Sequence, residues 1–344
     1  MGLLKKLGGA LKIPRNLIIG GIIGFSSMIY TGCCDSPKDS LRDPPYGVCV
    51  HAPYEDNLLD KIAEMNPPIV RADFDWDQME PERGEFNFTR TDKFVDFFYS
   101  RNIEILGLIA GCNPEWANGR NDDCHYMFLD VNDFKNYVRT TVSRYKNKVR
   151  YWEIGNEPNL PKFFKGTMEQ YFEDVLVPAA EVIKNIDKDL QIAAPSVVVM
   201  ENRKWDVWLE TLARDYNPYF DIASFHVYRS SDEGVISKVL FNPPCGFGKG
   251  PDRSVEKVLS KGFNGKTIWM TETGFKTTGG ELREIFQKDN YQGVLEDLGC
   301  WGPVSRVFFY HMIDATADGW YHYGILNPDL SEKEVYKYLK FKSN

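Results

Sequence analysis

Two glutamates in this chain each end a short run of β-forming residues and stand directly before or within a turn. Glu157 belongs to the segment YWEIGNEPN at 151–159, and Glu272 belongs to WMTETGF at 269–275. Strands that end in this way deliver a carboxylate to the rim of a sheet. Two rim carboxylates can cleave a glycosidic bond, because one carboxyl group protonates the leaving oxygen while the other carboxylate attacks the anomeric carbon. Two salt-bridge partners at the rim are the plain structural alternative.

The elements that must position these glutamates alternate along the chain after residue 45. Short apolar runs alternate with amphipathic segments, a pattern typical of βα units around a parallel sheet. The pattern predicts eight strands, near 47–51, 69–75, 104–110, 149–156, 190–195, 221–228, 266–272 and 304–310. Helices are predicted near 54–65, 89–102, 131–147, 168–187, 203–215, 252–262, 284–299 and 332–342. Eight strands, each followed by a helix, predict a single-domain (β/α)8 barrel of the α/β class, with its functional residues on the loops after the strands.

The contexts of the two glutamates also resemble a known family. The motifs NEP at 156–158 and TETG at 271–274, at the ends of the predicted fourth and seventh strands, resemble the signature of glycoside hydrolase clan A. This clan comprises retaining (β/α)8-barrel glycosidases, and the resemblance covers essentially the whole chain after about residue 41. PEWA at 114–117 and YGIL at 323–326 are most similar to family 39 and its relatives, which include β-xylosidases and exopolysaccharide hydrolases. The resemblance implies that Glu157 is the acid/base and Glu272 the nucleophile.

Three further polar residues are interpreted relative to these two. Asn156 is predicted to hydrogen-bond the sugar 2-hydroxyl, a contact that strengthens in the transition state; a turn residue is the alternative. Arg71 is predicted to keep Glu272 ionised, since a nearby cation favours the charged form; a structural arginine is the alternative. Glu153 shares strand parity with Glu157 but lies about 13 Å lower in the barrel. We therefore expect Glu153 to be the buried partner of an inward basic group.

Five more residues complete the candidate substrate site. The resemblance places His226 and Tyr228 beside the nucleophile, with the phenol hydrogen-bonded to the attacking oxygen. A core histidine that bonds a backbone carbonyl is the alternative for His226. His51, at the end of the first strand, is a weaker candidate of the same kind. Trp116 and Trp320 fall in rim loops and are predicted to stack on sugar rings, whose C–H faces are apolar.

The two longest loops, 111–130 and 229–251, are rich in Gly, Pro and Asn and are predicted to wall the cleft. If the protein is exported, Cys112 and Cys124 are the predicted disulfide, because both lie in one irregular loop. Closing that loop stabilises by roughly 3 kcal/mol in the chain-entropy model. The five histidines show no metal-binding spacing, and the Gly-rich stretch at 246–250 lacks the strand-to-helix context of a phosphate site. We therefore predict neither a metal nor another cofactor.

The N-terminal 32 residues contain four basic residues, no acidic residue and an apolar run at 17–25. This is the layout of an export signal. The segment YTGC at 30–33 resembles a bacterial lipoprotein cleavage site with Cys33 as the lipidated residue. An uncleaved membrane anchor and a buried helix of the folded domain are the alternatives. We predict a targeting or anchor segment with linker at 1–40, a catalytic domain at 41–344, and export to the cell surface or periplasm with the N-terminus as the only membrane contact.

The charge of the chain limits its partners. The net charge is −8 and becomes −12 without the four N-terminal basic residues. An acidic surface disfavours nucleic acid and anionic lipid, which both require basic patches. The predicted substrate is a polysaccharide or oligosaccharide, with no prediction about the sugar or the oligomeric state. A catalytically inactive barrel that binds glycan, and a barrel enzyme of unrelated metal-assisted chemistry, are the alternatives.

Overall fold

The computed structural model describes residues 46–51, 55–109, 111–200, 203–228, 262–263, 265–277, 281–300, 304–314 and 322–343. Contacts between Cα atoms divide the chain into residues 1–35 and 36–344, and every described residue belongs to the second part. The predicted targeting segment, the 229–251 loop, nearly all of the helix predicted at 252–262, and Trp320 therefore lie outside the described residues. Across the described ranges, none of the helices has the length and apolar character needed to span a bilayer.

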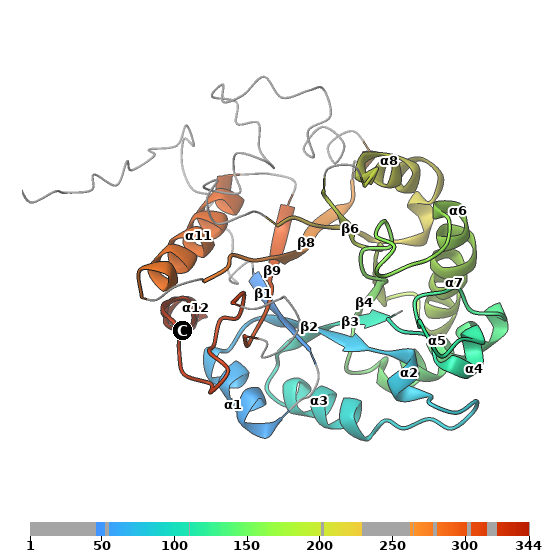
Figure 1. Ribbon diagram of the computed structural model, residues 1–344, viewed down its shortest axis with the longest axis horizontal. Helices are drawn as coiled ribbons and strands as arrows, with labels where there is room; N and C mark the ends of the chain where they lie inside the picture. The colour runs from blue at the N-terminus through green and yellow to red at the C-terminus, as the bar shows by residue number, and fades with distance from the viewer. Residues whose placement is uncertain are drawn as a thin grey trace, which may run out of the picture. The chain divides into compact units, whose positions relative to one another are not determined.

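The strands form one parallel sheet that closes on itself (Figure 1). The described strands are β1 (Tyr46–Val50), β2 (Ile69–Phe74), β3 (Glu104–Ile109), β4 (Tyr151–Ile154), β5 (Gln191–Ala193), β6 (Val197–Val198), β7 (Ile222–His226), β8 (Thr267–Thr273) and β9 (Val304–Phe309). They lie in the order β5-β4-β3-β2-β1-β9-β8-β7-β6, and a further pairing of β5 with β7 closes the sheet. Because β5 and β6 are two pieces of one strand position, interrupted at 194–196, the barrel has eight positions. The predicted (β/α)8 barrel is confirmed.

Helices cover the outside of the barrel in the order expected for βα units (Figure 1). The longer ones are α1 (Asp56–Met65), α3 (Thr89–Tyr99), α5 (Val131–Tyr145), α7 (Val177–Ile186), α8 (Trp205–Asp215), α11 (Glu281–Cys300) and α12 (Glu334–Ser343). Short elements are α2 (Trp76–Met79), α4 (Glu115–Asn118), α6 (Met168–Gln170) and the 3-10 turn η2 (Asn217–Tyr219). The single helix predicted at 168–187 is interrupted by a π-helix, η1 (Tyr171–Leu176).

The barrel interior changes from apolar to polar toward the carboxyl ends of its strands. A buried cluster from seven strands fills the lower interior, and its members are Cys49, Ile69, Leu106, Ala193, Ile222, Trp269 and Phe308. Two residues further along their strands, the same inward parity places Arg71, Ser224 and Thr271, all at most 1% exposed. The strand pattern therefore delivers a layer of buried polar groups directly beneath the barrel mouth. Cys49, a member of the lower apolar cluster, is 0% exposed.

Strand pairing is irregular near two of the predicted site residues, His226 and Glu272. The register between β7 and β8 shifts between Phe225 and His226, so that His226 pairs with Glu272. The register between β8 and β9 shifts between Met270 and Thr273. Such irregularities change the direction of side chains and are common next to active sites. These irregularities set the direction in which the Glu272 side chain projects at the barrel mouth.

Candidate active site

Arg71 of β2 is the centre of a buried ion network under the barrel mouth. Its Nε lies 2.5 Å from Oε2 of Glu153, and its Nη1 lies 2.5 Å from Oε1 of Glu272. Its Nη2 donates to Oδ1 of Asn156 at 3.0 Å. Arg71 and Glu153 are 1% and 0% exposed, so ion pairs and hydrogen bonds within the protein must compensate for the loss of hydration. The prediction that Glu153 is the buried partner of a basic group is confirmed.

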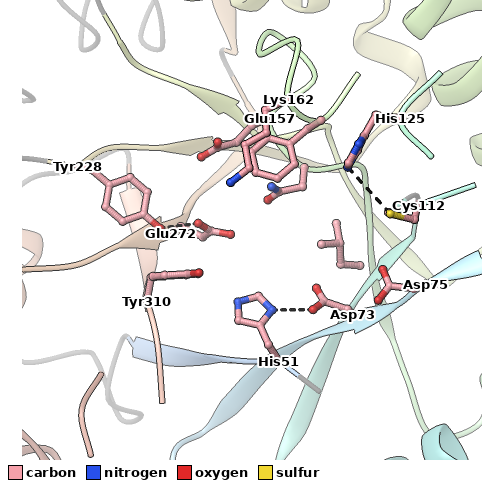
Figure 2. Close-up of a pocket in the computed structure, with 14 residues that line it drawn as sticks. His51, Asp73, Asp75, Cys112, His125, Glu157, Lys162, Tyr228, Glu272 and Tyr310 are labelled. Atoms are coloured by element: carbon pink, nitrogen blue, oxygen red, sulfur yellow. Dashed lines mark hydrogen bonds and ion pairs between the residues drawn. The ribbon is translucent and has the colours of Figure 1, made fainter. Parts of the chain in front are cut away.

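Glu157 and Glu272 meet across the barrel mouth (Figure 2). Glu157 follows the fourth strand position and Glu272 lies in the seventh, as the sequence predicted. One carboxylate oxygen of each, together with a ring nitrogen of His226, lie within 4.8 Å of one another. The carboxyl groups of retaining glycosidases are about 5–5.5 Å apart and those of inverting ones about 6.5–9.5 Å. An upper limit of 4.8 Å between one oxygen of each glutamate is compatible with the retaining spacing and shorter than the inverting one.

A tight turn after β4 presents Glu157. Gly155 has φ +95° and Glu157 has φ +45°, both in the left-handed region. Glycine adopts this conformation freely, whereas a residue with a side chain loses roughly 1–3 kcal/mol there. The neighbouring strand position holds the turn, since the backbone N–H of Glu157 donates to the carbonyl of Ser196 at 2.8 Å. Strain of this kind is concentrated at functional sites.

The two carboxyl groups lie in different environments. Glu157 is 5% exposed, and burial raises its pKa to about 7, against the opposing effects of Arg71 and Lys162. Glu272 instead accepts hydrogen bonds from Arg71 and from the hydroxyl of Tyr228, the latter at 2.5 Å. The site therefore holds one buried carboxyl group with a raised pKa and one that is surrounded by a cation and a hydroxyl donor.

His226 bridges the two glutamates. Its Nδ1 lies 2.8 Å from Oε1 of Glu157 and 3.5 Å from Oε2 of Glu272, and its Nε2 lies 3.1 Å from Oγ1 of Thr271. Burial lowers the pKa of His226 to about 4, so the ring is neutral near pH 7. With these partners, the tautomer we assign carries its proton on Nδ1. The structure thus brings both His226 and Tyr228 to the carboxylates, and the ring nitrogens of His226 contact side chains rather than a backbone carbonyl.

A cavity of about 260 Å³ opens in front of this pair (Figure 2). Its lining residues are His51, Asp73, Asp75, Leu108, Gly111, Cys112, His125, Asn156, Glu157, Lys162, Phe163, Tyr228, Glu272 and Tyr310. Sequence reasoning did not assign six of the polar or aromatic ones to the site, namely Asp73, Asp75, His125, Lys162, Phe163 and Tyr310. Asp73 and Asp75 follow Arg71 at intervals of two residues, which is a signal that could have found them. The loop residues show no comparable pattern.

The wall opposite the two glutamates contains His51, Asp73 and Asp75 (Figure 2). Nδ1 of His51 lies 2.6 Å from Oδ2 of Asp73. Burial alone would lower the pKa of His51, but the Asp73 carboxylate raises it. Nε2 of His51 has no hydrogen-bond partner in the described part of the chain. Burial, together with Asp73, raises the pKa of Asp75 to about 7.

The structure does not bring Trp116 to the cavity. Its ring packs edge-on against Trp76, with centroids 5.6 Å apart, and its Nε1 donates to the carbonyl of Glu80 at 3.0 Å. Arg83 lies 5.3 Å from the centroid of the same ring. These contacts occupy the indole in the packing of α2 against α4, so its aromatic face is used by the protein itself. The second predicted platform, Trp320, lies outside the described residues.

The predicted disulfide between Cys112 and Cys124 is confirmed, with Cα atoms 4.8 Å apart. It closes part of the 111–130 loop over one side of the cavity. The same loop is fastened by a hydrogen bond from the backbone N–H of Asn113 to the carbonyl of Cys124 at 3.0 Å. The disulfide therefore fixes the position of the segment that places His125 in the cavity wall.

Within the described part of the chain, two groups of side chains have the donor atoms of a metal site. Cys112, Cys124 and His125 form one, but its two sulfur atoms are bonded to each other. Glu157, His226 and Glu272 form the other. The guanidinium of Arg71, 2.5 Å from Glu272, already supplies a positive charge there and would repel a cation. The arrangement suits proton transfer and covalent attack better than metal binding.

Comparison with known proteins finds similarity to glycosidases. The family described as glycosyl hydrolase family 10 matches residues 52–178. A β-xylosidase of Caldicellulosiruptor saccharolyticus is 31% identical over 141 residues, which are 37% of this chain and 27% of that protein. Endo-1,4-β-xylanase 2 of Aureobasidium pullulans is 25% identical over 108 residues, 30% of this chain and 29% of that protein. The chain thus spans less than a third of the length of these relatives.

Solved structures share the fold over most of the chain. A family 39 glycoside hydrolase from Bacteroides cellulosilyticus has a TM-score of 0.63 at 19% identity, covering 88% of this chain and 64% of that one. Xylanase 10B from Thermotoga maritima has a TM-score of 0.64 at 16% identity, covering 86% and 94%. The predicted resemblance to clan A is confirmed, and the fold of this chain is a (β/α)8 barrel. The matches include both family 10 and family 39 proteins, in line with the predicted similarity to family 39 and its relatives.

Proposed function

We propose that the protein is a retaining glycosidase that cleaves O-glycosidic bonds of a polysaccharide or oligosaccharide by double displacement. One observation carries the proposal: two carboxylate oxygens, of Glu157 and Glu272, lie within 4.8 Å of each other in contrasting environments. Burial raises the pKa of Glu157 to about 7, whereas Arg71 and Tyr228 surround Glu272 with donors. Environments that separate an acid from a base in this way assign the catalytic roles.

In the first step, Glu272 attacks the anomeric carbon while the bond from that carbon to the leaving oxygen breaks. Glu157 gives its proton to the leaving oxygen, so the alcohol departs neutral and a glycosyl ester of Glu272 remains. Both reacting groups lie at the rim of one rigid barrel, which lowers the entropic part of the barrier. Loss of its proton leaves Glu157 as a carboxylate, which accepts the Nδ1–H of His226.

In the second step, Glu157 acts as a base. It takes a proton from a water molecule whose oxygen attacks the anomeric carbon, and the ester bond to Glu272 breaks. Glu157 is thereby protonated again and Glu272 is a carboxylate again. Two inversions give a product that keeps the configuration of the substrate. Asn156, oriented by Arg71, is placed to contact the sugar beside the reacting carbon.

The relatives suggest the first substrates to test. They are named β-xylosidases and endo-1,4-β-xylanases, and we propose xylan or xylo-oligosaccharides as the substrate class. Ten of the 14 residues that line the cavity carry polar groups that can bind hydroxyls, which suits a sugar. We further propose that the protein acts outside the cytoplasm, in keeping with the basic and apolar N-terminal segment and with the disulfide in the 111–130 loop.

The test is hydrolysis of 4-nitrophenyl β-glycosides, beginning with the xyloside and followed by xylo-oligosaccharides. We expect the wild-type protein to release nitrophenol and its Glu157→Gln/Glu272→Gln variant to release none. Glu169→Gln, an exposed glutamate in the first turn of α6, is the matched control and should keep full activity. Proton NMR of the first product should show the β-anomer before mutarotation. Binding of glycan without hydrolysis would instead establish the inactive glycan-binding barrel.

A further inference from the structure

We propose that Tyr171 is a positioning residue for Glu157, and that the π-helical turn which carries it serves this purpose. The inference rests on the proposed acid/base role of Glu157. Tyr171 itself contacts neither carboxyl group and does not line the cavity in front of them. Tyr171 is the first residue of η1, which interrupts the helix after β4. Isolated π-helical turns are rare and occur frequently at functional sites.

The local sequence accounts for the π-helical turn. Thr167 begins the helix with a capping box, in which its side chain and that of Gln170 exchange hydrogen bonds with the backbone. Eleven residues later Pro178 follows in α7. Proline has no N–H and its ring collides with the carbonyl four residues earlier, which disfavours α-helical hydrogen bonding just before it. The six-residue η1 lies directly before this proline and widens the helix where Tyr171 faces the barrel.

The hydroxyl of Tyr171 binds the backbone that leads to Glu157. It donates to the carbonyl of Ile154, the last residue of β4, at 3.0 Å. The side chain is 4% exposed, and its ring packs edge-on against Phe164 at 4.9 Å between centroids. A buried hydroxyl with a single backbone partner fixes the position of that partner, because the unpaired carbonyl would be costly in the interior. The end of β4 is therefore tied to η1.

The same hydroxyl fills the space beside Gly155. A Cβ added to Gly155 would collide with Oη of Tyr171 and would lie 2.8 Å from its Cζ. Gly155 also has φ +95°, and its N–H donates to the carbonyl of Ile109 in β3 at 2.8 Å. The turn is thus held by β3 on one side, by Ser196 on another and by Tyr171 from the helix layer. Glu157 lies two residues after Gly155, so any relaxation of this turn moves the acid.

Removal of this hydroxyl should affect the steps in which Glu157 gives or takes a proton, and kcat/KM reports the first of them. A displacement of about 1 Å can lower a rate about 100-fold, and general acid catalysis contributes about 100- to 10,000-fold. For Tyr171→Phe we expect kcat/KM on a phenyl glycoside, which needs the proton, to fall about 10- to 100-fold. On a 2,4-dinitrophenyl glycoside, whose leaving group needs no proton, kcat/KM should change less than about threefold. KM should change little, since Tyr171 does not line the cavity in front of the glutamates.

Tyr336→Phe is the matched control. Tyr336 is 0% exposed and donates to the carbonyl of Lys61 at 2.8 Å, which joins α12 to α1 far along the chain from β4. Its loss should destabilise the protein to a similar extent without any selective effect on the phenyl glycoside. A merely structural role of Tyr171 would lower the activity on both substrates alike, as in the control.

A second measurement does not depend on activity. Gly155→Ala should lower the Tm strongly, because the new Cβ meets the Tyr171 hydroxyl. In the Tyr171→Phe background the same substitution should lower the Tm less, although the strain at φ +95° remains. Equal Tm losses in both backgrounds, or parallel losses on the two glycosides, would overturn the inference. A wild-type protein that hydrolyses neither glycoside would overturn the proposed function instead.

Discussion

The guanidinium of Arg71 lies 2.5 Å from Oε1 of Glu272, and both side chains are buried below the barrel mouth. The same guanidinium pairs with Glu153. Its position explains how a carboxylate can be kept charged and correctly oriented inside a protein. Because one cation serves two buried carboxylates, its removal should affect stability and activity together.

Arg71→Met should therefore lower the free energy of unfolding at pH 7 by about 3–5 kcal/mol, the usual effect of leaving a buried charge unpaired. The deficit should shrink in acid, where the two unpaired carboxylates can protonate. Urea denaturation at pH 7 and at pH 4.5 measures the loss of unfolding free energy and its decrease in acid. Arg144→Met, which removes an ion pair with Asp92 on a partly exposed surface, is the control and should change stability by about 1 kcal/mol or less. An equal effect of the two substitutions would contradict the role of Arg71.

The pH dependence of activity should reflect the protonation of Glu157. Burial raises the pKa of Glu157 to about 7, and the first step requires its proton. We expect kcat/KM on an unactivated glycoside to fall as pH rises through about 7. The imidazole of His226, with a pKa lowered to about 4 by burial, stays neutral across this range and should not contribute. A profile that stays flat up to pH 9 would show that no buried acid governs the reaction.

The stability of the fold should also depend on the protonation of Glu157. The folded protein binds the Glu157 proton more tightly than the unfolded chain, so wild-type stability is lost as pH rises from about 4.5 to about 7. Glu157→Gln removes this loss but retains an oxygen that can accept the Nδ1–H of His226. The variant should equal the wild type near pH 4 and exceed it above pH 7, by at most on the order of 3 kcal/mol. Thermal unfolding across this pH range measures the difference. A stability difference between Glu157→Gln and the wild type that does not change with pH would exclude a raised pKa of Glu157.

The disulfide should stabilise the cavity wall. Replacement of Cys112 and Cys124 with Ser should lower the free energy of unfolding by roughly 3 kcal/mol in the chain-entropy model. Reduction of the wild-type protein with dithiothreitol should produce the same loss, while the Ser variant should be insensitive to the reductant. A loss of activity under conditions in which the reduced protein remains folded would show that the 111–130 loop also orders His125 at the cavity. Equal stability of reduced and oxidised protein would contradict this account.

The barrel and its two glutamates were predictable because they depend on local patterns. Alternating strands and helices repeat along the chain, and Glu157 and Glu272 stand where two apolar runs end. The two-residue β6 was missed, because the predicted fifth strand ended at Pro195 and β6 follows after Ser196. The π-helical turn before Pro178 was also missed, because its cause is a clash within a helix that reads as continuous.

The remaining site residues were harder to predict, for physical reasons. His125, Lys162 and Phe163 come from loops, whose direction is set by the disulfide and by backbone hydrogen bonds rather than by periodicity. Asp75 differs from an ordinary surface aspartate only through burial beside Asp73, which a single sequence does not display. Trp116 was assigned to the substrate because it is an aromatic residue in a rim loop, but its ring packs against the protein.

The stereochemistry of azide products from two variants tests the central claim most directly. With an activated aryl glycoside, Glu157→Ala should form the glycosyl ester of Glu272 quickly and then stall, because it lacks the base for the second step. Azide needs no base, so it should restore turnover and give a glycosyl azide of retained configuration. Glu272→Ala lacks the nucleophile, so azide should attack the substrate directly and give the inverted product. We predict this pair of outcomes, with Glu169→Ala unaffected by azide. Inverted product from Glu157→Ala and retained product from Glu272→Ala would show that the two roles are exchanged, and no rescue of either variant would contradict the double-displacement mechanism.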